Sequence, residues 1–244
     1  MTKVEAIKKI LVANNGVANL NTIYTEIDKY YVNLVKGKDW TAGIRGVLYR
    51  EIKKKRNFKK IGFSLYAVED YKEEDITSIK KDKVRMHSFM EGICLDIGNF
   101  LNLNTYTADP SAIYNNVPLS KLASLKNVPE FTYREIIETI KNIDILWFNR
   151  NGFAYPKKAI EVVDSIGTLE PALKRTFQLS EFNLSFYILC KSSDKPKVLK
   201  AIEKEPYLRL KHRYIVKDYE SILEIYQKPF LYQDDDLFKV SSLF

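Results

Sequence analysis

The chain has 244 residues, a net charge of +8 and a pI near 9.2, and 45% of its residues are hydrophobic. This length and composition fit one large globular domain or two smaller ones with a packed core. The two cysteines lie outside any CxxC pair, which argues against a zinc cluster or a disulfide framework. The two histidines argue against a His-rich metal site and against most His-based catalytic triads.

No apolar run reaches the ~18–20 residues that a membrane span needs. The first 15 residues predict an amphipathic helix and lack the cleavage region of a signal peptide, so we expect a cytoplasmic protein that does not contact membranes. The positive charge favours phosphate-bearing partners, although AT-rich coding in the host would also inflate the lysine count. The absence of a Walker-type or other nucleotide-binding glycine motif argues against an ATP-driven role.

Four elements are predicted in the first third of the chain. Apolar residues at helical spacing indicate three helices, and the turn Asn14-Asn15-Gly16 ends the first of them. The expected order is a helix over 3–13, a second helix capped by Asn21 or Thr22, a third over 41–55, and a β-hairpin over 58–68 that turns near Gly62.

Helices and strands alternate in the rest of the chain, which is typical of an α/β layer fold. A charged, poorly periodic stretch over 69–83 predicts a linker or a solvated link helix. After it we expect extended segments over 104–108, 143–148, 158–163, 184–190 and 213–216, a Pro-containing loop, and helices over 84–101, 132–139, from 168, over 195–204 and over 218–227. The predicted organisation is therefore two domains, 1–75 and 83–230, and an acidic tail over 231–244.

Basic residues gather between Lys36 and Lys60, where only Asp39 and Glu51 oppose ten lysines and arginines. They fall on the third helix and on the start of the hairpin. In a winged helix, that helix enters the DNA major groove and the hairpin lies along the backbone. The side chains expected to contact double-stranded DNA are Arg45, Arg50, Lys53, Lys54, Lys59 and Lys60. The alternative is a solvated, lysine-rich helix face.

The hairpin ends with the residues Gly62-Phe63-Ser64-Leu65-Tyr66-Ala67-Val68. With the amphipathic first helix and the apolar Ile44 and Leu48 of the third, this ending resembles the winged-helix module of a group that includes restriction endonucleases and chromatin regulators. The resemblance covers about the first 70 residues, and it implies that this part of the chain recognises DNA.

Two acids interrupt apolar strands in the second part of the chain. Asp144 begins the strand that continues Ile-Leu-Trp-Phe, and Glu161 lies within Ala-Ile-Glu-Val-Val after an Asn-Gly turn. A carboxylate among apolar residues is costly unless it is paired or bound to metal. Phosphodiester hydrolysis requires converging carboxylates of this kind to hold a divalent cation. The alternative is that one or both acids lie at a strand end in solvent.

The context of these acids resembles the PD-(D/E)XK nuclease superfamily, over about residues 84–216. The resemblance rests on three stretches, which are Ile143-Asp144-Ile145-Leu146-Trp147-Phe148, Ala159-Ile160-Glu161-Val162-Val163-Asp164-Ser165 and Leu173-Lys174-Arg175-Thr176-Phe177-Gln178-Leu179. The upstream stretch from His87 to Pro110 is similar to the opening helix and strand of the same domain. The fold class implied is α/β, a winged helix followed by a restriction-endonuclease-like mixed sheet flanked by helices.

By this resemblance, Asp144 and Glu161 are the metal-binding acids, and the cofactor is Mg²⁺ or Mn²⁺. The residue two positions after Glu161 shares its strand face and should be a lysine, but it is Val163, which cannot position water or stabilise the departing charge. The cations that could replace this lysine are Lys174 and Arg175 on the next helix, with Lys158 a weaker alternative. Glu91 on the opening helix is a further metal-site candidate. We interpret His87, one turn earlier, as a surface or hydrogen-bonded histidine.

Three functions remain open at this stage. The first is a Mg²⁺-dependent DNA endonuclease, a type II-like restriction enzyme that works as a homodimer because one such site cuts one strand. The second is a DNA-binding protein or regulator whose nuclease fold is catalytically degenerate, which the valine at position 163 favours. The third is an adaptor whose basic patch meets an acidic protein. The sequence does not decide whether the chain is an enzyme.

Overall fold

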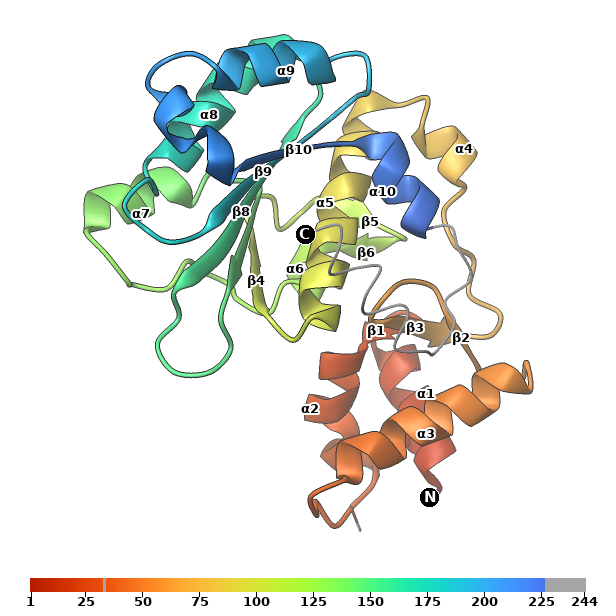
Figure 1. Cartoon of the computed structure of the whole chain (residues 1–244). Helices are drawn as coiled ribbons and strands as arrows, with labels where there is room; N and C mark the ends of the chain where they lie inside the picture. The colour runs from red at the N-terminus through yellow and green to blue at the C-terminus, as the bar shows by residue number, and fades with distance from the viewer. Residues whose placement is uncertain (33, 227–244) are drawn as a thin grey trace. The chain divides into compact units, whose positions relative to one another are not determined.

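The computed structural model describes residues 1–32 and 34–226, and within them the chain forms two compact units. The first unit contains Met1–Glu73 and the second begins at Glu74. Figure 1 shows both units, with the first coloured red to orange. The acidic tail predicted over 231–244 lies outside the described residues. No helix of the described part is both long and apolar enough to span a membrane.

The first unit packs three helices against a small antiparallel sheet whose strand order is β1-β3-β2 (Figure 1). Its elements are α1 (Lys3–Ala13), β1 (Val17–Asn19), α2 (Leu20–Tyr30), α3 (Trp40–Lys53), β2 (Phe58–Lys60) and β3 (Leu65–Val68). Ile7, Ile44 and Leu48 are fully buried in its core, and Trp40 packs against the same core. The three helices and the hairpin predicted from the sequence are therefore confirmed.

The start of α2 differs from the prediction. Asn19 caps this helix, and its side chain accepts a hydrogen bond from the Thr22 backbone N–H over 2.7 Å. Asn21 or Thr22 was expected to cap it, and that expectation was wrong. The reason is β1, a strand that the sequence did not indicate and that pairs with β3 up to Asn19, so the helix begins directly after it.

The charged stretch over 69–83 contains a short helix, α4 (Ile76–Ile79), in which Ile79 is buried. The carboxylate of Glu74 contacts Arg85 and also accepts a hydrogen bond from the Asn115 backbone N–H over 2.8 Å. The link was predicted as a linker or a solvated helix. Its second half instead packs into the second unit, because Ile76 and Ile79 provide a small apolar face at helical spacing.

The second unit is built on a mixed five-stranded sheet with the order β10-β9-β8-β7-β4 in the described residues. Strands β4, β7 and β8 pair antiparallel, whereas β8, β9 and β10 pair parallel. The strands of this sheet are β4 (Asn104–Thr107), β7 (Ile145–Phe148), β8 (Pro156–Val163), β9 (Ser185–Cys190) and β10 (Tyr214–Asp218). The α/β class and the mixed sheet are confirmed, and the five strands lie where extended segments were predicted along the chain.

Helices flank this sheet (Figure 1). They are α5 (Lys83–Phe100), α6 (Leu119–Leu122), α7 (Arg134–Ile140), α8 (Leu169–Phe177), α9 (Lys195–Ile202) and α10 (Tyr219–Tyr226), with 3₁₀ turns at Ile166–Thr168 and Tyr207–Arg213. A two-stranded hairpin, β5 (Ile113–Tyr114) and β6 (Val117–Pro118), occupies the region predicted as a Pro-containing loop. Asn115 and Asn116 form its turn with φ angles of 47° and 60°, as a two-residue type I′ turn requires.

Gly98 allows α5 to pack closely against the sheet. A Cβ atom at Gly98 would lie 2.5 Å from Thr105 Cγ2 and 2.7 Å from Trp147 Nε1, so only glycine allows this close approach of α5 to β4 and β7. Trp147 is fully buried on β7. Cys94 and Cys190 are fully buried free thiols, as the sequence predicted. Close packing of α5 brings the side chains of its first half to the start of β7 and the end of β8.

Candidate active site

Asp144 and Glu161 lie at the same end of two neighbouring strands. Ile145, the first residue of β7, pairs with Ile160 of β8, so Asp144 precedes this pair on one strand and Glu161 follows it on the other. The Val162 backbone N–H donates to Asp144 Oδ2 over 2.7 Å. Both acids line one pocket, and Glu161 is only 1% exposed. The two acids selected from the sequence are therefore brought together where β7 begins and β8 ends.

Helix α5 adds two residues to this cluster, His87 and Glu91, which lie one helical turn apart. Nε2 of His87 is 3.7 Å from Glu91 Oε1 and 3.8 Å from Asp144 Oδ2. Glu91 is 1% exposed, and its Oε2 atom is buried without a hydrogen-bond partner among residues 1–32 and 34–226. One ligand atom from each of His87, Glu91 and Asp144 can be chosen so that all three lie within 4.8 Å of one another.

Asp164, the residue directly after β8, fixes the imidazole of His87. Its Oδ2 is 2.8 Å from His87 Nδ1, and its Oδ1 accepts a hydrogen bond from the Tyr219 hydroxyl over 2.9 Å. The sequence predicted that His87 is hydrogen-bonded or at the surface, but it did not select Asp164 or Tyr219. For His87, the available signal in the sequence was its spacing of four residues from Glu91, which places both side chains on one face of a helix.

Of the residues expected to replace the lysine of the nuclease pattern, Arg175 on α8 contacts one of the two acids, Glu161. Its Nε and Nη2 atoms are 2.8 and 2.5 Å from the two carboxylate oxygens of Glu161. Lys174 points elsewhere, because its side chain is 70% exposed and its Nζ atom lies 3.8 Å from Glu170. Lys158 donates to the Tyr187 hydroxyl over 3.0 Å, at the other end of β8. Val163 is buried in the core beside α8.

Burial raises the pKa of all three acids in the cluster. The pKa of Glu91 rises to about 7 because burial disfavours its charge more than the neighbouring imidazole favours it. Burial also raises the pKa of Asp144. For Glu161, burial and the adjacent Asp144 carboxylate raise the pKa well above its ordinary value despite Arg175. Because burial disfavours the charged form of these three carboxylates, an additional positive charge would stabilise the site.

The pKa of His87 is raised, although burial alone would lower it. Burial lowers this pKa, but the hydrogen bond to Asp164 and the carboxylates of Glu91 and Asp144 outweigh burial and raise the pKa to about 10. In the absence of other cations, the imidazole therefore carries the proton that partly neutralises the cluster.

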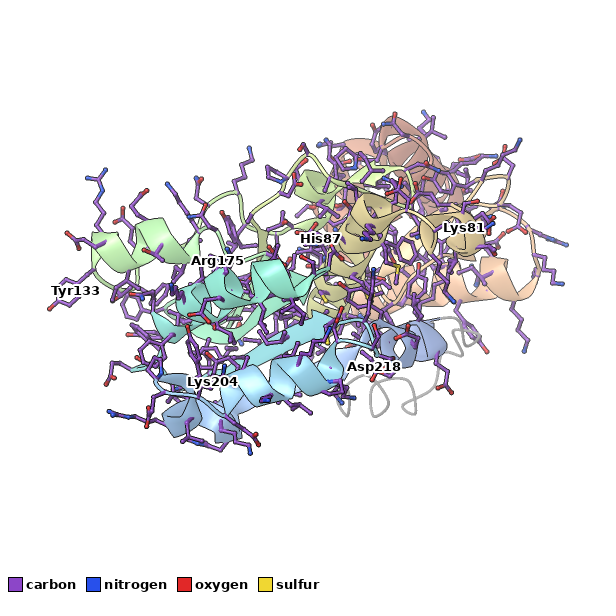
Figure 2. The ribbon with its side chains drawn as sticks, turned by 90° about the horizontal axis from the view of Figure 1, so that it is seen from above. Lys81, His87, Tyr133, Arg175, Lys204 and Asp218 are labelled. Atoms are coloured by element: carbon purple, nitrogen blue, oxygen red, sulfur yellow. The ribbon has the colours of Figure 1, made fainter. Side chains whose placement is uncertain are left out.

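The pocket formed by these groups has a volume of about 290 Å³. Its walls come from α5, the residue before β7, the end of β8, the 3₁₀ turn that follows and α8. The lining residues that provide its charge are Asp144, Glu161, Asp164, His87 and Arg175. Figure 2 labels His87 on α5 and Arg175 on α8. His87, Asp144 and Glu161 at this small pocket, with Glu91 beside His87 and Asp144, can hold a divalent cation. Arg175 adds a guanidinium that can contact a phosphate.

The basic residues expected to contact DNA lie on α3, at Lys54 directly after it, and on β2 of the first unit. Four of them, Arg45, Arg50, Lys53 and Lys54, are exposed, whereas Lys59 and Lys60 are half-buried. The Arg45 guanidinium donates to the Tyr24 hydroxyl over 3.0 Å, and Lys59 Nζ is 3.1 Å from the Glu73 carboxylate. The surface of α3 therefore presents several positive side chains to solvent.

A family model for the C-terminal domain of the Type II restriction enzyme NmeDI matches residues 68–243. The chain belongs to this NmeDI C-terminal domain family. Comparisons with curated proteins and with solved structures gave no match. The part of the chain that matches the NmeDI family model contains every residue of the pocket described above. The basic α3 surface precedes this part in the sequence.

Type II restriction enzymes generally use divalent metal ions, and the pocket of this NmeDI-family chain fits such an ion. The fit rests on the buried Glu91 Oε2 atom, which has no hydrogen-bond partner in the described residues, and on the excess of carboxylates over cationic side chains. Oxygen donors of this kind are the ligands that hard divalent cations prefer.

Proposed function

We propose that the chain is a metal-dependent DNA endonuclease of the restriction type. The observation that carries this proposal is that Asp144 and Glu161 line one pocket, and that His87 and Glu91 lie beside Asp144 at a spacing that suits a metal ion. All four residues lie within the region that matches a Type II restriction enzyme. The proposed cofactor is Mg²⁺ or Mn²⁺, and the substrate is double-stranded DNA in the cytoplasm.

The residues of the pocket have separate roles in this proposal. Asp144 and Glu161 are the proposed metal-binding acids, with Glu91 on the α5 side. A bound divalent cation would supply Lewis-acid stabilisation of the scissile phosphate and make the attacking water more acidic. Arg175 holds Glu161 in place and offers its guanidinium to the negative charge that develops on the phosphate.

The arrangement of the second unit supports membership of the PD-(D/E)XK superfamily. A helix is followed by three antiparallel strands, a helix and a parallel strand, in the elements α5, β4, β7, β8, α8 and β9. Asp144 precedes the second of these strands, and Glu161 lies near the end of the third. The chain departs from the superfamily pattern at Val163, where a lysine is expected. The burial of Val163 leaves no room for a cationic side chain there, and in the proposal Arg175 replaces the lysine.

The first unit is proposed to be a winged-helix DNA reader. Its order of helix, strand, helix, helix, strand and strand, with the sheet order β1-β3-β2, is that of a winged helix. The exposed side chains of α3 would enter the major groove, and Lys59 and Lys60 on β2 would contact the backbone. The assembly is proposed to be a homodimer, because one site of this type cuts one strand.

The test is cleavage of plasmid and phage DNA by the full chain with Mg²⁺, with Mn²⁺ and with EDTA. We expect nicked or linear products with a divalent cation and none with EDTA. A gel shift in EDTA should still detect DNA binding. If DNA binds but is not cut under any metal condition, the proposal of an endonuclease is wrong.

The burial of Val163 favours a second function, in which the same fold binds DNA without cutting it. Loss of the lysine from this position removes a group that nucleases of this type use to stabilise charge. DNA binding without cleavage would support this second function. Absence of DNA binding as well would support the adaptor function, in which the basic surface meets an acidic protein.

A further inference from the structure

We infer that His87 is a nitrogen ligand of the metal in this pocket, together with Glu91 and Asp144, and that the pocket therefore prefers Mn²⁺ or a similar transition-metal ion to Mg²⁺. The inference deepens the proposed function, because it names the ion used at the same site. It also reassigns His87, which the sequence indicated only as a surface or hydrogen-bonded residue.

The spacing of the three side chains suits one shared cation. Nε2 of His87 lies 3.7 Å from Glu91 Oε1 and 3.8 Å from Asp144 Oδ2. Both distances are longer than a hydrogen bond. Both are shorter than ~4.2 Å, which is twice a typical metal–ligand bond of ~2.1 Å to nitrogen or oxygen. Atoms separated in this way can lie around one ion with open angles between them.

The imidazole is oriented for this role by its other nitrogen. Nδ1 of His87 is 2.8 Å from Asp164 Oδ2, and the Tyr219 hydroxyl donates to Asp164 Oδ1 over 2.9 Å. A carboxylate that accepts from Nδ1–H keeps the proton on that nitrogen, so Nε2 is the nitrogen that releases its proton when a metal binds. The hydrogen-bonded chain from Tyr219 through Asp164 to His87 therefore fixes both the tautomer and the direction of the ring.

Glu91 provides an independent observation that points to a ligand. Its side chain is 2% exposed, and its Oε2 atom has no hydrogen-bond partner among the described residues. A buried carboxylate oxygen without a partner is costly. Because Nε2 of the neighbouring His87 is too distant for a hydrogen bond to Oε1, a cation between the two residues would satisfy Glu91 better than the imidazole does.

The choice of ion follows from the donor atoms. Mg²⁺ prefers oxygen ligands, retains several waters and gains little from an imidazole. Transition-metal ions of the first row accept imidazole and carboxylate together. A set of one nitrogen and two carboxylates therefore favours Mn²⁺ and its neighbours in the periodic table over Mg²⁺.

The experiment is pulsed electron paramagnetic resonance of Mn²⁺ bound to the full chain, with titrations of Mn²⁺ and Mg²⁺ by calorimetry. A directly coordinated imidazole gives ¹⁴N modulation of the Mn²⁺ signal. The chain contains only two histidines, so His212→Gln on the exposed 3₁₀ turn is the matched control for His87→Gln. The variant Asp164→Asn tests the orientation of the ring while His87 is retained.

We expect ¹⁴N modulation in the wild type and in His212→Gln, and its loss in His87→Gln. Affinity for Mn²⁺ should fall at least ~10-fold in His87→Gln and about 10-fold in Asp164→Asn, whereas affinity for Mg²⁺ should change less than ~3-fold. The ratio of the Mn²⁺ and Mg²⁺ affinities is the readout, and a change of folding alone would alter both affinities together. Circular dichroism of each variant checks the fold.

The inference is wrong if Mn²⁺ binds without ¹⁴N modulation, or if His87→Gln keeps the wild-type affinity ratio. DNA cleavage that depends on metal, combined with either result, would leave the proposed endonuclease function intact and reject His87 as a ligand. Mn²⁺ that binds with ¹⁴N modulation to a protein that never cuts DNA would support His87 as a ligand and reject the endonuclease function.

Discussion

The guanidinium of Arg175 contacts both carboxylate oxygens of Glu161, with Nε 2.8 Å from Oε1 and Nη2 2.5 Å from Oε2. Glu161 is almost fully buried on β8, and Arg175 is 26% exposed on α8. This two-pronged contact joins the helix to the strand at the candidate active site. It also makes Arg175 the cationic partner of an acid that is almost fully buried.

Substitution Arg175→Ala should destabilise the second unit by about 3 kcal/mol, because it leaves the buried Glu161 carboxylate without its partner. Urea unfolding of the full chain in EDTA measures the change. The double variant Glu161→Gln/Arg175→Ala should recover roughly 1–2 kcal/mol, since it removes the isolated charge. Lys174→Ala is the matched control on the same helix and should change stability by less than ~0.5 kcal/mol. An equal loss in both single alanine variants would contradict a specific role for the ion pair.

Substitution Asp144→Asn should abolish DNA cleavage while the protein still folds and binds DNA. The asparagine oxygen can still accept the hydrogen bond from the Val162 backbone. The charge proposed to hold the metal is lost. The expected loss of rate is at least ~10²-fold. Plasmid nicking in Mn²⁺ measures it, with the exposed Asp70→Asn as the control. Unchanged cleavage by Asp144→Asn would place the active site elsewhere.

The exposed basic side chains of α3 should contribute to DNA binding in the absence of metal. Substituting Arg50 and Lys53 with alanine should weaken binding and reduce the slope of log K against log salt by ~1 for each phosphate that the variant no longer neutralises. Fluorescence anisotropy at several salt concentrations measures both effects. The control is Lys8→Ala on α1, which removes an exposed positive charge outside the α3 and β2 set. Equal losses in all variants would indicate a nonspecific effect of net charge.

Limited proteolysis should separate the two units between Tyr71 and Lys83. Lys72 is exposed at the end of the first unit, and Lys80 and Lys81 are exposed after α4 (Lys81 is labelled in Figure 2). We expect trypsin to cut first at Lys72, because α4 and Glu74 pack within the second unit. Mass spectrometry of the earliest fragments identifies the site. Resistance of this stretch, with early cleavage elsewhere, would show that the units are not separable.

Asp218 should contribute to stability at neutral pH and lose this contribution in acid. Its ion pair with Lys195, at 2.8 Å, and the Ser221 backbone N–H lower its pKa to about 2, below the ordinary 3.8. Because the folded pKa is depressed, the stabilisation is present above pH ~4 and declines as pH falls toward 2. Asp218→Asn should therefore cost about 1 kcal/mol at pH 7, after allowance for solvent screening, and less at pH 3.

Urea unfolding at the two pH values measures this difference. Glu203→Gln is the control, because it breaks a surface contact with Lys211 at 2.7 Å and should have little effect at either pH. A cost for Asp218→Asn that is the same at pH 3 and pH 7 would mean that the carboxylate charge is not the source of the stabilisation.

The long elements of this fold could be predicted because their residue patterns are strong. The apolar run predicted as a strand over 184–190 is β9 (Ser185–Cys190), and the helix predicted from residue 168 is α8 (Leu169–Phe177). The short strands could not be predicted in the same way. Strands of two or three residues, such as β1 and the β5–β6 hairpin, are too short to show periodicity and depend on their pairing partners.

The candidate site could be predicted only where the chemistry is visible in one segment. Asp144 and Glu161 stand out because each interrupts an apolar strand, and both line the pocket. His87, Asp164 and Tyr219 come from the first half of α5, the residue after β8 and the first residue of α10. Asp164 and Tyr219 are not unusual in their own segments, and the signal for His87 is limited to its spacing of four residues from Glu91. The contacts of all three residues arise only after the sheet and its helices have assembled.

The two tryptophans are divided between the two units. Trp40 begins α3 and packs against the core of the first unit, where its ring centroid lies 5.4 Å from that of Tyr24. Trp147 is fully buried on β7 in the second unit. Each unit therefore carries its own intrinsic fluorophore, so that the emission of Trp40→Phe follows the second unit alone and the emission of Trp147→Phe follows the first, without any attached label.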